Sequence, residues 1–129
     1  MYYHVWFVTK YRRITLKGEI EKFVKDILAE CIARHNYRVL ELETNKDHLH
    51  MLVETKDKKH LVALVRTLKA ISAKEILQTP YFRMGNVRHF WARRYGYKEI
   101  KETEIESIGE YIRNQKKIPH SEECGKSLR

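Results

Sequence analysis

With 129 residues, the chain is long enough for one domain with a single core and too short for two. Its 26 lysine and arginine residues outnumber the 17 aspartate and glutamate residues, so the net charge is +9, which suits a polyanionic partner. Nucleic acid is the leading candidate and an anionic membrane surface the alternative, but no apolar stretch has transmembrane length. Residues 1–9 also lack a charged leader region and a cleavage site, and we expect them to form a strand.

The first half of the chain predicts a strand, a helix and a hairpin. Residues 2–9 alternate and are rich in aromatic and β-branched types, which is typical of a strand. Apolar residues at helical spacing then predict a helix from about Lys17 to His35. Two further strands are predicted over 37–43 and 48–55, joined by the turn-rich segment 44–47.

The second half predicts a helix, a strand and a last helix. Leucine, valine and isoleucine residues recur at helical spacing and predict a second helix that ends before Pro80. After a loop, residues 89–95 predict a fourth strand. Thr103 and Glu106 form a capping box that opens a final helix over 103–118. The remaining residues form a polar tail that we expect to be loosely ordered.

This order, β-α-β-β-α-β followed by an extra helix, predicts an α+β fold of the ferredoxin-like type, an antiparallel sheet with two helices on one face. The whole chain, 1–129, then forms a single domain whose core spans 1–97. Along the strand 48–55, the odd-numbered residues should pack beneath the two helices, because successive side chains point to opposite faces. The even-numbered residues, which include two histidines, should stand on the open face.

The two cysteines indicate the cellular compartment of the protein. Cys31 lies in the apolar pattern of the first helix and Cys124 in the polar tail. They form neither a disulfide framework nor a zinc-binding spacing, so we expect an intracellular, reducing environment.

A pair of histidines is the most informative motif. His48 and His50 flank Leu49 on a predicted strand, so both imidazoles should project from one face and could hold a metal ion. Histidines at this spacing also occur as solvated or core residues. A second motif favours the metal, because Tyr111 and Gln115 are four residues apart on the last helix and therefore share a helix face.

Two neutral imidazoles and one amide carbonyl would give a cation three ligands without cancelling its charge. Mg²⁺ or Mn²⁺ suits that set, with imidazole favouring Mn²⁺, whereas a closed zinc site needs four strong ligands that are not evident. Glu54, on the histidine face, could replace Gln115 as the third ligand, and Gln115 would then be merely solvated. His4 could reach the same face, although a core or stacking role fits it better.

Tyr111 would lie one helical turn from a metal ligand, where it could attack a phosphate bound to that metal. A free phenol is mostly protonated at neutral pH and needs a nearby cation to favour phenolate. Attack would expel a sugar oxygen and leave a phosphotyrosine ester, so strand transfer would take two steps without a nucleotide cofactor. A helical tyrosine alone is more often a packing residue, and only its combination with Gln115 and the histidines reverses that interpretation.

Basic residues accompany these motifs, and they suit backbone contacts with nucleic acid as well as a solvated surface. Arginines beside Trp91 and Tyr95 fit backbone contact combined with base stacking, and we expect about half of the set to touch the bound strand. The set comprises Lys10, Arg12, Arg13, Arg66, Lys69, Lys74, Arg88, Arg93 and Arg94.

His48-Leu49-His50 together with Tyr111 and Gln115 resembles the motifs of a known family, the single-tyrosine HUH transposases of insertion sequences. In that family the His-hydrophobic-His motif binds a metal, and the nucleophilic tyrosine is followed four residues later by a metal-binding glutamine. The resemblance extends to Lys10-Tyr11-Arg12-Arg13, to Lys69 with Ser72 and to Trp91 with Tyr95, so it spans nearly the whole chain.

The resemblance implies a metal-dependent nick of single-stranded DNA that leaves a 5′-phosphotyrosine on Tyr111 and a free 3′-hydroxyl, followed by rejoining to a new partner. It also implies DNA ends that form imperfect hairpins and a homodimer that exchanges its tyrosine helices, with residues 96–102 as the expected hinge. A prokaryotic, cytoplasmic and nucleoid-associated protein is expected on the same basis.

Three other functions stay open. A non-catalytic RNA-binding module would use exposed aromatic residues on its central strands, which the histidine strand lacks. A replication initiator or plasmid nickase would share the histidines and the tyrosine but normally belongs to a longer chain. A domesticated relative that cuts genomic repeat hairpins would share the whole catalytic set and is harder to separate.

Overall fold

The computed structural model of the protein describes residues 1–83 and 89–117. Its sheet is antiparallel, with strands in the order β2-β3-β1-β4, an arrangement that two split β-α-β units produce. The strands are β1 (Tyr2–Val8), β2 (Arg38–Asn45), β3 (His48–Glu54) and β4 (Gly96–Ile100). The predicted α+β class and ferredoxin-like arrangement are therefore confirmed.

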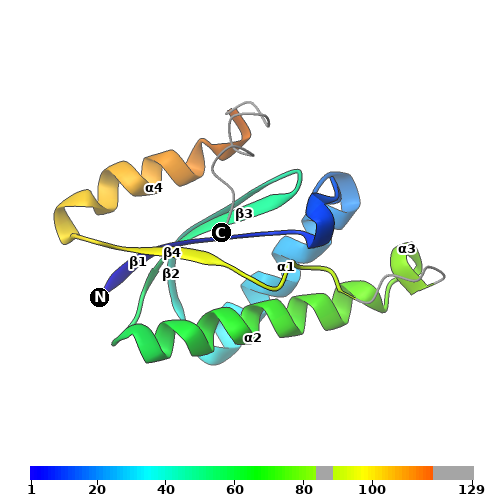
Figure 1. Cartoon of the computed structure of the whole chain (residues 1–129), viewed down its shortest axis with the longest axis horizontal. Coiled ribbons are helices and arrows are strands. Elements are labelled where there is room, and N and C mark those ends of the chain that lie inside the picture. The colour runs from blue at the N-terminus through cyan, green and yellow to red at the C-terminus, as the bar shows by residue number, and fades with distance from the viewer. Residues whose placement is uncertain (84–88, 118–129) are drawn as a thin grey trace.

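Two helices, α1 (Gly18–His35) and α2 (Lys58–Leu77), cover one face of the sheet (Figure 1). Asn36 caps the end of α1 with left-handed backbone, and its N–H donates to carbonyls of the last turn. α2 begins after Asp57, whose carboxylate accepts a hydrogen bond from the backbone N–H of His60. α1 matches its predicted span, and α2 ends before Pro80 as predicted.

The main core lies between this helical layer and the sheet. It is built from the inward side chains of β1 and β3 and from one apolar stripe of each helix. The odd-numbered side chains of β3 are buried there, as the period of a strand predicts. Its members include Val5, Phe7, Leu28, Leu49, Met51, Val53, Leu64 and Leu68.

The prediction of a fourth strand over 89–95 is wrong, because the strand that pairs with β1 is β4, over 96–100. Trp91 forms only an isolated bridge to Thr9, and its indole N–H donates to Ser72 Oγ at 2.8 Å on the helical side. The aromatic residues that indicated a strand therefore belong to the core. β4 itself is a largely exposed edge strand, so its sequence carries little of the alternation that marks a strand.

The last helix, α4 (Ile105–Arg113), lies across the other face of the sheet (Figure 1). Its buried Ile112 packs with Leu52 and Ile100 in a second, small core. The expectation that the histidine face is open is therefore wrong, since α4 covers it. Leu52 gives the physical reason, because an apolar side chain on that face leaves water only under a cover.

A 3₁₀ turn over Glu102–Glu104, labelled η2, precedes α4 and contains Thr103. The predicted helix cap at Thr103 is therefore wrong. Glu104 instead accepts a hydrogen bond at 2.9 Å from the backbone N–H of Lys101 and closes the turn. Most of the predicted hinge, 96–102, is occupied by β4, which leaves only Lys101 and the turn between strand and helix.

Three short elements complete the described chain, η1 (Lys10–Arg12), α3 (Pro80–Arg83) and η3 (Gln115–Lys117). Cys31 is buried and carries a free thiol. None of the helices in the described part of the chain is both long and apolar enough to cross a membrane. The predicted tail, 119–129, lies outside the described residues together with its Cys124.

Candidate functional site

The histidine pair lies on β3, on the face that α4 covers. His48 is opposite Val8 of β1 and His50 is opposite Trp6, so the strand register fixes both imidazoles on one side. Their ring centroids are 5.2 Å apart and the rings are nearly perpendicular. Only 3% of His48 and 7% of His50 is exposed. The two histidines therefore meet as predicted, but at a site that is shielded from solvent.

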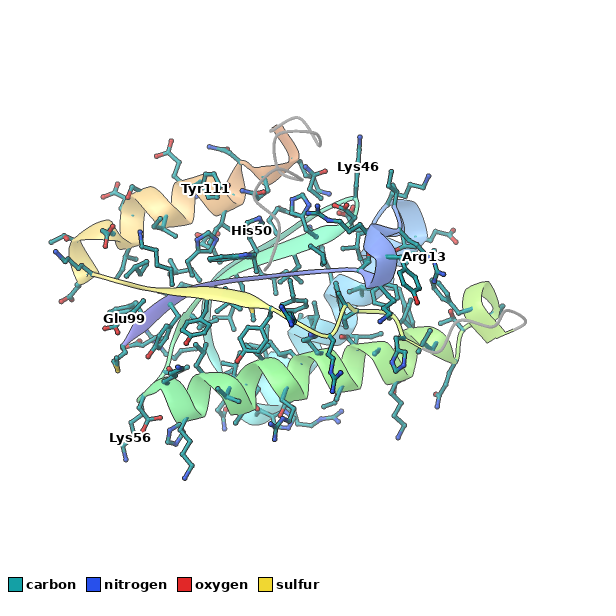
Figure 2. All side chains as sticks on the ribbon, in the orientation of Figure 1. Arg13, Lys46, His50, Lys56, Glu99 and Tyr111 are labelled. Carbon is teal, nitrogen blue, oxygen red and sulfur yellow. The ribbon has the colours of Figure 1, made fainter. Side chains whose placement is uncertain are left out.

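Tyr111 reaches this site from α4. Figure 2 shows it above His50, which lies on the sheet. The Tyr111 ring centroid is 5.9 Å from that of His50 and 5.9 Å from that of His4, with an edge-on arrangement in both pairs. The chain thus places its own tyrosine, which is half-buried, beside its own histidines.

Gln115 follows in η3, after α4 has ended at Arg113 and Asn114 has left helical geometry. The side chain is fully buried. Its Nε2 donates to the Tyr111 carbonyl at 3.3 Å, and its Oε1 lies 3.4 Å from His48 Nε2. The four-residue spacing therefore brings Gln115 beside the histidines as predicted, although the helix is not continuous between the two residues.

Each histidine has a partner at its second ring nitrogen. His48 Nδ1 lies 2.9 Å from Asp47 Oδ1, and His50 Nδ1 lies 2.9 Å from His4 Nε2. When these Nδ1 atoms carry the protons, both Nε2 atoms keep a lone pair for a ligand. The spacing motifs do not predict either partner. The signals that could have found them are the position of Asp47 next to His48 and the alternation of β1, which puts His4 on this face.

The donor atoms at this site fit a divalent cation that takes nitrogen and oxygen ligands. The 3.4 Å between His48 Nε2 and Gln115 Oε1 is long for a hydrogen bond and suits two donors to one ion. Across residues 1–83 and 89–117, no three histidine, cysteine or acidic side chains form a metal-binding group, so the third donor would be the amide. The alternative third ligand, Glu54, lies at the far end of β3 and pairs with Arg38.

Polar contacts hold α4 and the turn after it against the sheet. The guanidinium of Arg113 donates to the carboxylate of Glu41 on β2 at 2.5 Å. Asn45, at the end of β2, donates from Nδ2 to the backbone carbonyl of Gln115 at 2.9 Å. These contacts fix the end of the helix and the buried glutamine together.

A second ion pair joins η3 to α1. Lys116 donates to Glu21, which also accepts a hydrogen bond from Thr44 Oγ1. Burial alone would raise the pKa of Glu21, but the hydrogen bonds from Lys116 and Thr44 outweigh burial and lower the pKa below its usual value. The carboxylate therefore stays charged, and the ion pair persists, at neutral pH.

The basic residues predicted to contact nucleic acid fall into two groups, both of which border His89 and Phe90. One is the turn after β1, where Arg12 Nε lies 3.8 Å from Asp47 Oδ2. The other lines a groove of about 430 Å³ between α2 and residues 89–95. The turn contains Lys10, Arg12 and Arg13, and the groove contains Arg66, Lys69 and Arg93 beside Trp91 and Tyr95. Lys74 and Arg94 are exposed, and Arg88 lies outside the described residues.

Lys69 is bound to the protein itself. Its Nζ donates to the carbonyls of Ala92 at 2.7 Å and Arg93 at 3.2 Å, and it lies over the rings of Phe7 and Tyr95. Burial lowers the pKa of Lys69 to about 8. The ammonium therefore positions the segment before β4, and a contact between Lys69 and nucleic acid stays a prediction.

Comparison with known sequences shows a matching family and similar proteins. The family described as "Transposase IS200 like" matches residues 1–115. The chain is 33% identical over 119 residues to "Transposase for insertion sequence element IS200" of Salmonella typhimurium, covering 88% of this chain and 75% of that protein. It is 29% identical over 118 residues to the ISDra2 transposase TnpA of Deinococcus radiodurans, covering 88% of this chain and 82% of that protein.

Two solved structures are also similar. A Deinococcus radiodurans crystal structure assigned as a transposase superposes with a TM-score of 0.69 at 26% identity, over 90% of this chain and 91% of that chain. The REP-associated tyrosine transposase bound to a REP hairpin superposes with a TM-score of 0.67 at 11% identity, over 88% of this chain and 65% of that chain. At so low an identity the second likeness shows the fold alone. The relatives found by sequence and by structure are thus transposases, the same class of proteins that the motifs around Tyr111 indicate.

Proposed function

This chain belongs to the IS200-like transposase family and is a DNA transposase, and we propose that Tyr111 nicks and rejoins single-stranded DNA through a 5′-phosphotyrosine. The observation that carries this proposal is the meeting of Tyr111 with His48, His50 and Gln115 at one shielded site. A tyrosine that served only packing would need neither two imidazoles nor a fully buried amide beside it.

The proposed step is a substitution at phosphorus. The phenolic oxygen of Tyr111 bonds to the phosphorus and loses its proton to solvent. The bond from phosphorus to the 3′ oxygen breaks, and that oxygen takes up a proton and leaves as a 3′-hydroxyl. The 3′-hydroxyl of a new partner then attacks the phosphotyrosine and releases the phenol. The phosphoester is kept throughout, so no nucleotide cofactor is needed.

His48, His50 and Gln115 would hold Mg²⁺ or Mn²⁺ through two Nε2 atoms and one amide oxygen. A bound ion would offset the charge that develops on the phosphate oxygens. The chain's own contribution is to orient the two imidazoles and shield them from water, while the half-buried Tyr111 stays within reach of solvent. Asp47 and His4 engage the two Nδ1 atoms, and α4 covers the site, which strengthens the charge interactions there.

We further propose single-stranded DNA with hairpin ends as the substrate and a homodimer with exchanged tyrosine helices as the assembly, in a prokaryotic nucleoid. The net charge of +9 supports a DNA partner, and one structural neighbour was solved bound to a REP hairpin. An exchange of helices would have to turn about the short link over 101–104, because β4 is paired with β1 up to Ile100.

The test is formation of a covalent adduct between the protein and DNA. Purified protein is incubated with labelled hairpin oligonucleotides and Mn²⁺, and the products are separated on a denaturing gel. We expect a metal-dependent adduct with the wild type and none with Tyr111→Phe, which keeps the ring beside His50 and lacks the nucleophilic oxygen.

Tyr97→Phe is the matched control, because Tyr97 is an exposed tyrosine on β4. It should form the adduct as the wild type does. An adduct that survives in Tyr111→Phe would contradict the assignment of the nucleophile. Tight hairpin binding by the wild type without any adduct, in Mn²⁺ or in Mg²⁺, would favour a non-catalytic binding module instead.

A further inference from the structure

We propose that Tyr11, in η1, is a stacking platform for one unpaired base of the DNA strand that crosses the histidine site. The inference rests on the proposed function, because the strand in question is the one whose phosphate Tyr111 would attack. The ligand is a single-stranded nucleic acid. The ring takes a base, and the neighbouring lysine and arginines take the flanking phosphates.

The exposure of Tyr11 is the first observation. At 76%, Tyr11 is the most exposed large hydrophobic side chain in the described part of the chain. Folding removes little of its aromatic surface from water, so the ring contributes little to the core. A ring this exposed offers single-stranded DNA a stacking interaction that tolerates any base, because every base has a π-face.

The backbone of the turn holds this ring outward under strain. Tyr11 and Arg12 both adopt left-handed backbone, with φ of 57° and 52°, which is disfavoured for residues that carry a side chain. Hydrogen bonds from Arg12 N–H to Thr9 O at 2.9 Å and from Thr9 Oγ1 to Arg13 O at 2.7 Å lock the turn. A strained turn in which none of the three residues is buried in the core indicates a function at its surface.

Two cations lie over the ring. Lys10 Nζ and the guanidinium carbon of Arg13 each lie 5.1 Å from the centroid of the Tyr11 ring. Residues 10–13 contain three basic side chains and no acidic one, so the local field favours an anionic chain. Phosphates on both sides of a stacked base match this arrangement, with cations for the backbone and the ring for the base.

The turn is connected directly to the histidine site. The Thr9 N–H donates to the Asp47 carbonyl at 2.8 Å. Arg12 Nε lies 3.8 Å from one carboxylate oxygen of Asp47, and the other carboxylate oxygen contacts His48 Nδ1. A DNA strand that lies against the turn therefore also lies beside the proposed metal ligands.

The distance between the turn and Tyr111 suits a short stretch of DNA. Figure 2 shows Arg13 and Lys46 at one end of the sheet, with His50 and Tyr111 further along it. β1 runs between the two positions and rises about 3.3 Å per residue. A strand that presents its phosphate to Tyr111 would thus bring a base to Tyr11 within a few nucleotides.

The test measures DNA binding by protein that carries Tyr111→Phe, so that cleavage does not contribute. One labelled single-stranded oligonucleotide is made in versions that each lack a single base, and each affinity is measured by fluorescence anisotropy. We expect one abasic position to weaken binding about 5- to 100-fold. Tyr11→Leu should weaken binding to the intact strand by the same factor and remove the effect of that position. Tyr11→Phe should restore both.

Tyr97→Leu is the matched control. Tyr97 is 38% exposed and has Lys58 Nζ 5.2 Å from its ring centroid, but it lies on β4 instead of η1. This variant should change neither the affinity nor the abasic profile. Thermal melting of every variant shows whether the substituted protein remains folded, and the abasic scan on protein with an intact Tyr11 does not depend on that substitution.

Equal affinities of Tyr11→Leu and Tyr97→Leu for the intact strand would overturn the proposal, as would an unchanged abasic profile in Tyr11→Leu. Altered sedimentation of Tyr11→Leu with unaltered DNA affinity would also overturn it, because a second copy of the chain would then cover the ring. Since the assay reads binding in the Tyr111→Phe background, failure of the tyrosine chemistry leaves its result intact, and the two proposals fail separately.

Discussion

His48 and His50 are oriented by partners of different chemistry. Asp47, only 1% exposed, presents a carboxylate to His48, whereas His4 presents an imidazole to His50. A carboxylate fixes the ring and raises the basicity of a ligating imidazole through its negative charge. An imidazole fixes the ring without that charge. The two histidines should therefore differ in how strongly their partners support metal binding.

Removing the charge of Asp47 should weaken Mn²⁺ binding more than changing His4. We expect Asp47→Asn to lower the affinity about 10- to 100-fold, the range typical of an outer-shell partner. His4→Gln keeps an acceptor for His50 Nδ1 and should cost less. Calorimetric titration of both variants and the wild type, without DNA, gives the comparison. Equal losses, or a larger loss for His4→Gln, would show that the carboxylate has no special role.

The groups proposed to react could be predicted from the sequence, and so could the face on which His4 lies, but the contacts of Asp47 and His4 with the two histidines could not. The pair on β3 and the pair at the end of α4 have fixed spacings, which a strand or a helical turn converts into a shared face. His4 has no such spacing with His50. The pairing of β1 with β3 brings them together, and a contact over that sequence separation leaves no periodic signal.

α4 is held against the sheet by the small core around Ile112 and by an ion pair near the end of the helix. Ile112 packs on Leu52, and Arg113 pairs with Glu41 near the end of the helix that carries Tyr111. The side chains of Arg113 and Glu41 are 53% and 24% exposed. A pair this exposed contributes modestly in water, but it acts on the part of the helix whose position matters for the tyrosine.

Charge reversal of Glu41 should slow adduct formation. Glu41→Arg would repel Arg113 and loosen the end of α4, and we expect a several-fold loss that stays below about tenfold because the pair is partly exposed. The double variant Glu41→Arg with Arg113→Glu restores the attraction and should recover most of the rate. The time course of adduct formation measures both effects. Absence of recovery in the double variant would mean that this ion pair does not position the tyrosine.

Periodicity explains which elements could be predicted. α1, α2 and the two central strands carry long apolar patterns, and their spans agree closely with the structure. β4 is short and exposed, so its sequence shows the pattern of a strand less clearly than the aromatic core segment before it. The cover that α4 forms over the histidines was not predicted either, although Leu52 on that face already required one.

The positive charge of the molecule is divided between two regions. The turn after β1 adjoins the histidine site, whereas the groove with Arg66 and Arg93 lies against α2, on the side of the sheet away from α4. DNA bound in the groove would lie across the sheet from Tyr111, the nucleophile that we propose. This division suits a substrate in which folded and reacting DNA are held at different places.

Arg66→Ala and Arg93→Ala test the groove. Each substitution should lower the slope of log affinity for hairpin DNA against log salt concentration by about one, because each side chain would neutralise one phosphate. Adduct formation on a short strand without a hairpin should be unchanged. The affinities are measured over a series of salt concentrations. An unchanged slope in both variants would show that the groove does not contact the DNA backbone.

Lys69 makes the free energy of unfolding of the protein change with pH in the alkaline range. Burial lowers its pKa to about 8, from an ordinary value of 10.5. Between these values the unfolded chain binds more protons than the folded one, so the contribution of Lys69 to the free energy of unfolding rises with pH. The difference in free energy of unfolding between the wild type and Lys69→Met, measured with urea, should therefore shift in favour of the wild type from pH 7.5 to pH 10. An equal difference at both would contradict the lowered pKa.

The decisive measurement is the mass of the peptide that carries DNA after reaction. The protein is reacted with a hairpin oligonucleotide and Mn²⁺, trimmed with nuclease and digested with trypsin, which releases residues 102–113 with Tyr111 as their one tyrosine. We predict that this peptide gains the mass of a nucleotide joined through its 5′ phosphate to the phenolic oxygen. A nucleotide on any other peptide, or a linkage through the 3′ phosphate, would contradict tyrosine catalysis as proposed.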